Sequence, residues 1–417
     1  MLSREVLMKV KIRNVEHIRI CGGKNVVCHW PLQGGIWYFG DDEILLGHIH
    51  APCRYKNPQE VEHGPDGMRS RAVVRLQRSR DLGYTWPEEE SQILYDYTLP
   101  REQQRSVLHI DEYTSDNEPK REFIDLSLPD AIMAFGWTAT EYIGKEYTDP
   151  KGNVFCPYIM WGFRSANRGH TWEKIPSIIW PNHTDSVHGT GNCYLKQQDG
   201  TLLAWLIGTD HQFERGGKRH RIMGPQVYMS IDNGIQWYYV SEIYFDPHRR
   251  VSCGYPRIMK LPSGRLLCTL GMWMYRSRND VRWISLSYSD DGGLSWSEPK
   301  RINRWGVSPY GLLLKDGRIV IIYARRHTNA YGMFCIVSED SGLTWSDEII
   351  LRKDPMPSMG VFDGIIQSRK VVDGGYPVAV QLRDNRIFIA YYYQLEEKDV
   401  PWPGGRKFIA GTFFDLA

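Results

Sequence analysis

The chain has 417 residues and a formal net charge of +2, with 24 Tyr, 15 Trp and 42% hydrophobic residues. So small a net charge gives no general attraction to nucleic acid or to a membrane surface, and no basic run is interleaved with aromatic residues. No stretch reaches the ~18 consecutive apolar residues of a membrane-spanning helix. We therefore expect no nucleic-acid partner and no membrane partner.

An eight-residue pattern, Ser-x-Asp-x-Gly-x-Thr-Trp or a close variant, recurs five times along the chain. The copies are Ser79–Trp86, Ser165–Trp172, Ser230–Trp237, Ser289–Trp296 and Ser338–Trp345. In each copy an Asp, or Asn167 in the second, can accept backbone N–H groups of a tight turn, and a Gly supplies positive φ. The terminal Trp can pack its apolar face under that turn. Apolar strands precede the copies, so each copy predicts the tip of a β-hairpin.

A second series of short turns, each flanked by apolar strands, predicts the number of sheets. These turns are Gly40–Glu43, Leu128–Asp130, Gln198–Gly200, Pro262–Gly264, Lys315–Gly317 and Arg383–Asn385. Six inner hairpins and five outer ones predict an all-β fold, a six-bladed β-propeller with four-stranded blades that occupies residues 1–417 as one domain. We expect Glu16–Ile20 to close the ring by completing the last blade beside Phe408–Phe414.

The repeated box is identified as the Asp-box, or BNR repeat, and the chain resembles the sialidase superfamily of β-propellers over nearly its whole length. The resemblance implies that the boxes lie on peripheral blade hairpins, away from the active site. It also implies a carbohydrate-active enzyme whose centre must be sought on other residues.

The eight cysteines are scattered without Cys-x-x-Cys pairs, and most fall in strand-like segments where Cys acts as a small buried apolar residue. Met1–Lys11 carries charges where a secretory signal needs an apolar core. Both features favour a reduced, cytoplasmic protein. We expect no cofactor and no metal. His48 and His50 with His29 or His188 could bind a metal ion, but structural or acid/base roles are favoured.

In a propeller the innermost strands line the central channel, so functional side chains are expected just before each inner strand and just after its partner returns. Titratable and aromatic residues gather at those positions: His29, His48, His50, His188, Asp210, His211, Tyr255, Arg257, Tyr310, Arg325, Arg326, Asp363 and Tyr376. We expect His29, His48, Asp210 and Tyr376 to be catalytic and the others to bind substrate. The Arg and His side chains predict a cationic rim that binds an acidic sugar.

The resemblance to sialidases assigns a role to one of these residues. Gly375–Leu382 looks like the last-blade segment in which those enzymes place a nucleophilic Tyr, at the position of Tyr376. His29 stands where the family has the first Arg of its carboxylate clamp, and Tyr255 stands where it has a Glu. Since ring closure brings the first and last blades together, we expect His29 and Tyr376 to face one another.

Three classes of function fit these residues. The first is an exo-acting glycoside hydrolase, with Tyr376 as nucleophile or as stabiliser of an oxocarbenium-like centre. Its general acid is Asp210, Asp363 or Glu214, of which Asp210 has the better placement, at a strand return beside His211. The second is a lyase acting on a uronic acid, with His29 or Tyr55 as base and Arg71 or Arg257 at the carboxylate. The third is a non-catalytic glycan-binding propeller. Each takes an oligosaccharide or glycoconjugate as its partner, and each is compatible with a homo-oligomer.

Overall fold

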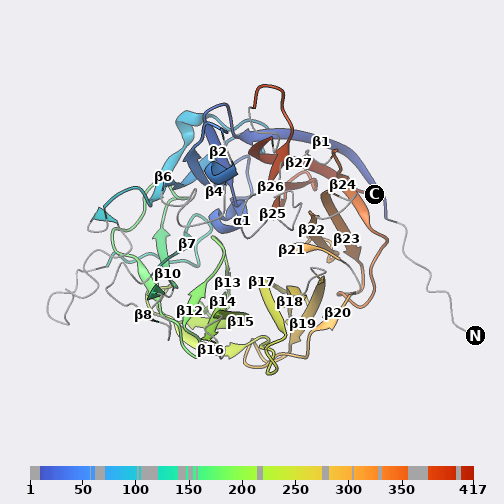
Figure 1. Cartoon of the computed structure of the whole chain (residues 1–417). Helices are drawn as coiled ribbons and strands as arrows, with labels where there is room; N and C mark the ends of the chain where they lie inside the picture. Colours follow the sequence, from blue (N-terminus) through green and yellow to red (C-terminus); the bar gives the residue numbers. More distant parts are fainter. Residues whose placement is uncertain are drawn as a thin grey trace, which may run out of the picture.

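A computed structural model describes residues 10–56, 58–61, 71–100, 103–104, 121–139, 147–148, 154–155, 158–213, 219–274, 281–302, 305–326, 331–355, 374–400 and 405–417. Within these ranges six antiparallel sheets of three to five strands stand in a ring. A separate two-stranded sheet consists of β8 (Tyr147–Thr148) and β9 (Val154–Phe155). Figure 1 looks along the central channel. The predicted six-bladed β-propeller is confirmed.

The first three blades follow one another around the ring (Figure 1). Blade one contains β2 (Val26–His29), β3 (Ile36–Tyr38), β4 (Ile44–Pro52), β5 (Val73–Ser79) and β6 (Gln92–Asp96). Blade two contains β7 (Ile132–Ala139), β10 (Tyr158–Ser165) and β11 (Ser177–Ile179). Blade three contains β12 (Ser186–His188), β13 (Tyr194–Lys196), β14 (Leu202–Phe213), β15 (Arg219–Ser230) and β16 (Tyr238–Glu242).

The last three blades have the four strands predicted for each of them. Blade four contains β17 (Val251–Lys260), β18 (Leu266–Met274), β19 (Arg282–Ser289) and β20 (Lys300–Arg301). Blade five contains β21 (Val307–Leu313), β22 (Ile319–Arg325), β23 (Gly332–Ser338) and β24 (Ile349–Arg352). Blade six contains β25 (Gly375–Gln381), β26 (Ile387–Leu395), β27 (Arg406–Leu416) and β1 (Ile12–Cys21).

The described residues include three single helical turns: α1 (Pro31–Gly34) between β2 and β3, and the 3₁₀ turns Pro58–Val61 and Glu88–Glu90. Over the described residues, no helix is long and apolar enough to cross a membrane.

Blade two departs from the predicted four strands, since the described residues give it three. Before the turn at Leu128 we expected an inner strand, but residues 121–127 run as irregular chain and turns. The amides there are bound by side chains, not by a neighbouring strand: Leu126 N–H donates to Asn233 Oδ1 at 3.1 Å and Ser127 N–H donates to Asp125 Oδ1 at 2.8 Å. An amide that donates to a side chain in this way is not available to a sheet ladder.

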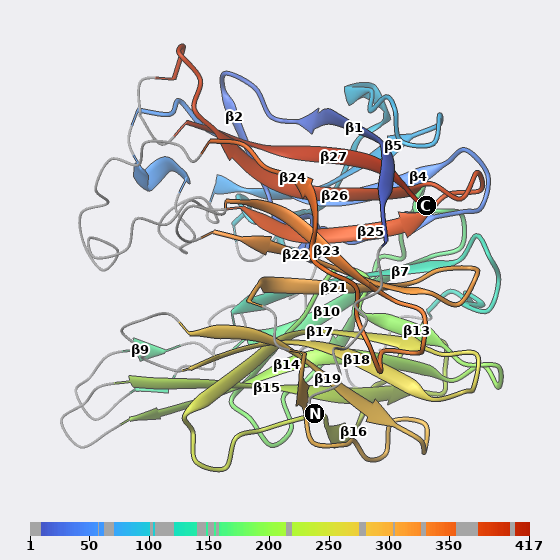
Figure 2. The ribbon, with the colours of Figure 1, turned by 90° about the vertical axis from the view of Figure 1, so that its right-hand side faces the viewer.

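The ring closes as predicted, by a strand from the start of the chain. β1 pairs antiparallel with β27, with Glu16 opposite Phe413 and Ile18 opposite Gly411. Figures 1 and 2 both show β1 beside β27. Segments almost 400 positions apart therefore share one blade, and the seam between blades six and one lies at this strand.

Each Asp-box forms a hydrogen-bonded turn just before the outermost strand of its blade, after β5, β10, β15, β19 or β23. In the first, Gly83 N–H donates to Ser79 Oγ at 2.9 Å, Thr85 N–H donates to Asp81 Oδ1 at 2.9 Å, and Trp86 Nε1 donates to Gly83 O at 2.8 Å. Gly83 has a φ of 94°, the left-handed region that Gly adopts at little cost. The side chains of the box are thus engaged in holding its own turn.

Candidate active site

The same irregularity, a residue of positive φ followed by Pro, recurs in four blades: within the inner strands β17, β21 and β25, and between β2 and α1 in blade one. The four residues are Trp30 (φ 52°), Tyr255 (54°), Ser308 (49°) and Tyr376 (51°). A residue before Pro is normally pushed toward extended backbone, so these positions are strained. In blades four, five and six the strained residue lies in a β-bulge of the inner strand, a device that redirects a side chain.

Three of these four residues line one cavity of about 190 Å³ in the channel. Five blades supply its lining, which includes five Trp and Tyr residues: Trp30, Trp137, Tyr255, Trp273 and Tyr376. The polar side chains are Gln33, His188 and Thr190. No carboxylate side chain belongs to the lining formed by the described residues. Aromatic faces with a few polar groups are typical of a site that binds a sugar ring.

Tyr255 and Tyr376 form a hydrogen-bonded pair at the cavity, with 2.9 Å between their hydroxyl oxygens. The two rings meet edge to face, 5.3 Å apart at 89°. Arg326 lies over the Tyr376 ring, with the guanidinium carbon 4.8 Å from the centroid. The guanidinium cation therefore lies against the face of the ring that carries this hydroxyl.

The wall formed by Trp30 and Gln33 is set by close backbone approaches around α1. A Cβ on Gly34 would lie 1.9 Å from the carbonyl carbon of Gly47, so a larger residue cannot replace Gly34 without moving β4. Gly191 N–H, from the loop of blade three, donates to Leu32 O at 3.0 Å. The His188–Thr190 wall and the α1 wall are therefore held together.

The structure brings together His188, Tyr255 and Tyr376 in the cavity lining, with Arg326 beside them. His29 does not belong to that lining. It is fully buried, and its ring lies 5.1 Å from that of Tyr392, which in turn lies 5.6 Å from the ring of Tyr376. Tyr392 thus stands between the two residues expected to face one another.

Four other predicted residues are engaged with protein groups. Arg257 donates to Asn192 O at 3.2 Å and stacks over the buried ring of Tyr310, 4.6 Å from its centroid. Arg325 pairs with Glu348, and Asp210 pairs with Arg249. Asp363, Glu214 and the side chain of His211 lie outside what the structure describes.

Tyr55 and Arg71, which were expected to act in a lyase, form hydrogen bonds to main-chain carbonyl groups. Burial raises the pKa of Tyr55, whose hydroxyl donates to Val26 O at 2.9 Å and to Lys407 O at 3.0 Å. Arg71 donates to Pro52 O and Glu60 O at 3.0 and 3.2 Å. Neither side chain lines the cavity.

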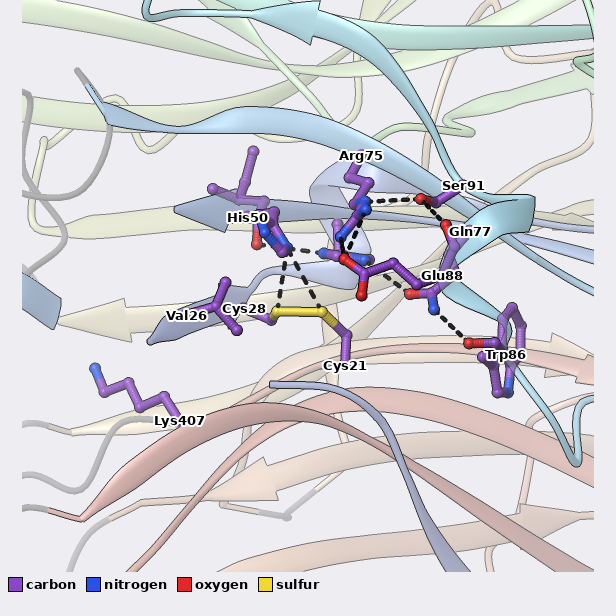
Figure 3. The surroundings of a disulfide bond; sticks show 12 residues. Cys21, Val26, Cys28, His50, Arg75, Gln77, Trp86, Glu88, Ser91 and Lys407 are labelled. Atoms are coloured by element: carbon purple, nitrogen blue, oxygen red, sulfur yellow. Dashed lines mark hydrogen bonds and ion pairs between the residues drawn. A yellow bond between two sulfur atoms is a disulfide. The ribbon is translucent and has the colours of Figure 1, made fainter. Parts of the chain in front are cut away.

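His48 and His50 lie in a separate cluster with Cys21 and Cys28. Figure 3 labels His50 and the two cysteines. Burial, with a smaller contribution from His50, lowers the pKa of His48 to about 3. Burial and the Arg75 guanidinium lower the pKa of His50 to about 4. Both imidazoles are therefore neutral at physiological pH and poorly suited to carry a proton to substrate. A disulfide joins Cys21 to Cys28, a pairing that the sequence analysis did not predict, whereas Cys53, Cys193, Cys253, Cys268 and Cys335 are buried free thiols.

Sequence reasoning missed the three tryptophans of the cavity, Trp30, Trp137 and Trp273. A signal for Trp30 was present, because the repeated residue-before-Pro pattern marks Trp30, Tyr255, Ser308 and Tyr376 at equivalent strand starts. That pattern selects Trp30, not its neighbour His29, as the residue directed into the channel.

Fold and cavity together define a sialidase-like β-propeller with an aromatic central pocket. The sequence model of the BNR repeat-like domain matches residues 157–389, more than half of the chain, and the chain belongs to this family. A sialidase of Paraclostridium sordellii is 29% identical over 181 residues, a match covering 36% of this chain and 43% of that sialidase. The chain thus aligns with less than half of that curated relative.

Two solved structures share the fold. A protein of unknown function from Dyadobacter fermentans superposes with a TM-score of 0.65 at 20% identity, over 97% of this chain and 99% of its own. An α-L-arabinanase of Penicillium chrysogenum superposes with a TM-score of 0.52 at 14% identity, over 97% and 98%. These two likenesses show the propeller fold. The family match and the sialidase relative place the chain in the sialidase and BNR superfamily.

Proposed function

We propose that the protein is an exo-acting glycoside hydrolase that removes an acidic sugar, with Tyr376 as nucleophile. The observation that carries the proposal is the Tyr255–Tyr376 hydroxyl pair in the aromatic cavity. The cavity, at about 190 Å³, is smaller than the ~300–1,000 Å³ of pockets for drug-sized ligands. It suits one terminal sugar ring better than the middle of a polymer.

In the proposed reaction the Tyr376 oxygen attacks the anomeric carbon as the bond to the leaving oxygen breaks. The hydroxyl proton of Tyr376 passes to the Tyr255 oxygen, 2.9 Å away, while Tyr255 gives its own proton to water, and the same relay returns a proton to Tyr376 in the second step. His188, in the same lining, is the proposed general acid that protonates the leaving oxygen. Water then displaces Tyr376 from the sugar, one of its protons restores the acid form of His188, and the relay restores the Tyr376 hydroxyl.

The preference for an acidic sugar rests on the charges around the cavity. Arg326 lies 4.8 Å from the Tyr376 ring centroid, His188 can become cationic, and no described lining residue is a carboxylate. A sugar carboxylate would meet donors there and no like charge. Of the arginines expected at the rim, Arg326 is the one that lies over the ring of the proposed nucleophile Tyr376, and it carries this part of the proposal.

The composition of the lining also favours a second candidate, a glycan-binding propeller without catalysis. Five aromatic residues and no carboxylate among the described lining residues would suffice to stack and orient a sugar.

The experiment is incubation of the protein with sialosides, uronate-containing oligosaccharides, arabinosides and rhamnosides. New reducing ends and the ultraviolet absorbance of an unsaturated uronate are read together, and binding is measured by calorimetry. The hydrolase predicts reducing ends without absorbance from an acidic substrate. Binding with no turnover of the same sugar would favour the glycan-binding candidate, and absorbance would establish a lyase instead.

A further inference from the structure

Four side chains that carry metal-binding atoms meet at the seam where the ring closes. Cys21 ends β1, Cys28 lies in β2, and His48 and His50 lie in β4. One ligand atom from each of the four lies within 4.8 Å of the others. We call this group the seam cluster. It is separate from the central cavity, since none of its members lines that cavity.

The strand pairing accounts for this meeting. Cys28 and His50 are direct partners across the β2–β4 ladder, which places their side chains on one face. His48 precedes His50 by two positions and therefore projects to the same side of β4. Cys21 arrives with the closing strand β1, which pairs with β27 of blade six. The seam cluster is complete only when the first and last blades are joined.

The geometry points to a Zn²⁺ site: we propose that Cys21, Cys28, His48 and His50 of the reduced chain bind one Zn²⁺ ion. The disulfide between Cys21 and Cys28 is then the oxidised alternative to the metal-bound state. Two Cys and two His are among the common ligand sets of structural zinc sites. The inference does not depend on the hydrolase activity proposed above.

The distances suit a tetrahedral ion. His50 Nδ1 lies 3.6 Å from Cys21 Sγ and 3.6 Å from Cys28 Sγ. Zn–S bonds of about 2.3 Å and Zn–N bonds of about 2.0–2.1 Å at tetrahedral angles put sulfur and nitrogen about 3.6 Å apart, and the two sulfurs about 3.8 Å apart. Reduction would therefore have to separate the sulfurs, while His50 already lies at ligand distance.

The surroundings of the seam cluster can orient its ligands. The His48 ring lies between two acceptors, with Nδ1 3.4 Å from Ile49 O and Nε2 3.4 Å from Gln77 Oε1. Whichever nitrogen binds the metal, the other can donate to one of these oxygens, as metal-bound histidines usually do. Gln77 is itself fixed, since its Nε2 donates to Trp86 O at 2.7 Å.

The charges around the seam cluster are also compatible with the ion. Two thiolates and Zn²⁺ sum to zero, so the partly buried site carries no uncompensated charge. The neighbouring Arg75 is directed to Glu88 and Ser91, with 3.1 Å to Glu88 Oε1 and 3.0 Å to Ser91 Oγ (Figure 3). A bound ion would join the outermost strand of blade six to the inner strand of blade one, whose continuation carries Trp30 into the cavity.

The experiment uses the full chain after reduction with a water-soluble trialkylphosphine. The phosphine takes the oxygen of one water and becomes its oxide, and each sulfur takes one hydrogen. Zn²⁺ or Co²⁺ is then titrated without oxygen. We expect one equivalent of Co²⁺ to give tetrahedral d–d bands and thiolate-to-cobalt charge transfer, release of the two thiol protons, and displacement by Zn²⁺.

Matched variants locate the site. Cys28→Ala should lose the charge-transfer bands at one equivalent, whereas Cys335→Ala, which removes an equally buried free thiol in blade five, should retain them. Gln77→Ala should keep the bands but lower metal affinity by about 10–100-fold, because it removes an acceptor that orients His48. If Cys28→Ala fails to fold, the titration of the reduced wild-type chain still shows whether thiolates bind one metal ion.

Two outcomes would overturn the proposal. One is a reduced, folded wild-type chain that shows no thiolate-to-cobalt absorption at one equivalent. The other is unchanged one-equivalent binding in Cys28→Ala. Either result would leave the pair as a disulfide without a metal function.

Discussion

The Asp-boxes at the periphery and the inner-strand starts at the centre both use left-handed backbone, but for opposite purposes. In the first box, Gly83 takes the positive φ, and Ser79, Asp81 and Trp86 direct their polar atoms into the same turn. At the centre, the positive φ falls on large residues before Pro, and the Tyr255 and Tyr376 side chains leave the turn for the cavity. The peripheral turns add stability, whereas the central turns hold strain where side chains must be aimed.

The largest expected effect is on the peripheral side of this comparison. Trp296→Ala should lower the free energy of unfolding by about 3 kcal/mol, the lower end for Trp removal because the ring is half-buried. The variant also loses the Nε1 hydrogen bond to Gly293 O. Chemical denaturation measures the loss, with Trp180→Ala, an exposed Trp, as the control. Turnover lost at unchanged stability would place a box in the active site.

A smaller effect is expected from the cation beside Tyr376. Arg326→Ala should raise KM for an acidic substrate by about 10-fold or more, since a hydrogen bond to a charged group contributes about 1.5–3 kcal/mol, and should leave binding of a neutral glycoside unchanged. Arg325→Ala is the matched control, because the neighbouring Arg325 is paired with Glu348. Equal losses for acidic and neutral sugars in Arg326→Ala would contradict an acidic preference.

The smallest effect is a gain in stability. Ser308 has the same strained φ as the cavity residues but does not line the cavity, and its Oγ is buried without a hydrogen-bond partner. Ser308→Gly should therefore stabilise the fold by up to about 1 kcal/mol, by relieving left-handed strain and removing that hydroxyl. Thermal unfolding measures the shift. A clear destabilisation would show that the inner-strand starts are not strained as described.

The boxes could be predicted because each is encoded locally, in the Ser, Asp, Gly and Trp of one turn. The ring closure could be predicted because a propeller needs a strand to complete its last blade, and Glu16–Ile20 is strand-like and lies near the start of the chain. The cavity could be predicted only in part. Whether His29 or Trp30 enters the channel depends on the positive φ of Trp30 directly after β2. Simple alternation of side chains along a strand does not predict such an irregularity.

Other candidate residues do not line the cavity, because they contact partners that are distant in sequence. Arg257 stacks on Tyr310 and Arg325 pairs with Glu348, contacts that depend on how strands and blades pack. His48 and His50 meet Cys21 only through ring closure by β1. A list of candidate residues along the chain therefore merged two clusters that the fold separates.

The most direct test of the proposed active site compares turnover per folded molecule in Tyr376→Phe and Tyr288→Phe. Tyr288 is the control because its hydroxyl donates to Gly342 O at 3.3 Å in the outer part of blade four, away from the cavity. We predict that Tyr376→Phe lowers kcat by ~10²-fold or more with unchanged unfolding, and that Tyr288→Phe retains wild-type turnover. Wild-type turnover in Tyr376→Phe, on a substrate that the protein hydrolyses, would contradict the assignment of Tyr376 as the nucleophile.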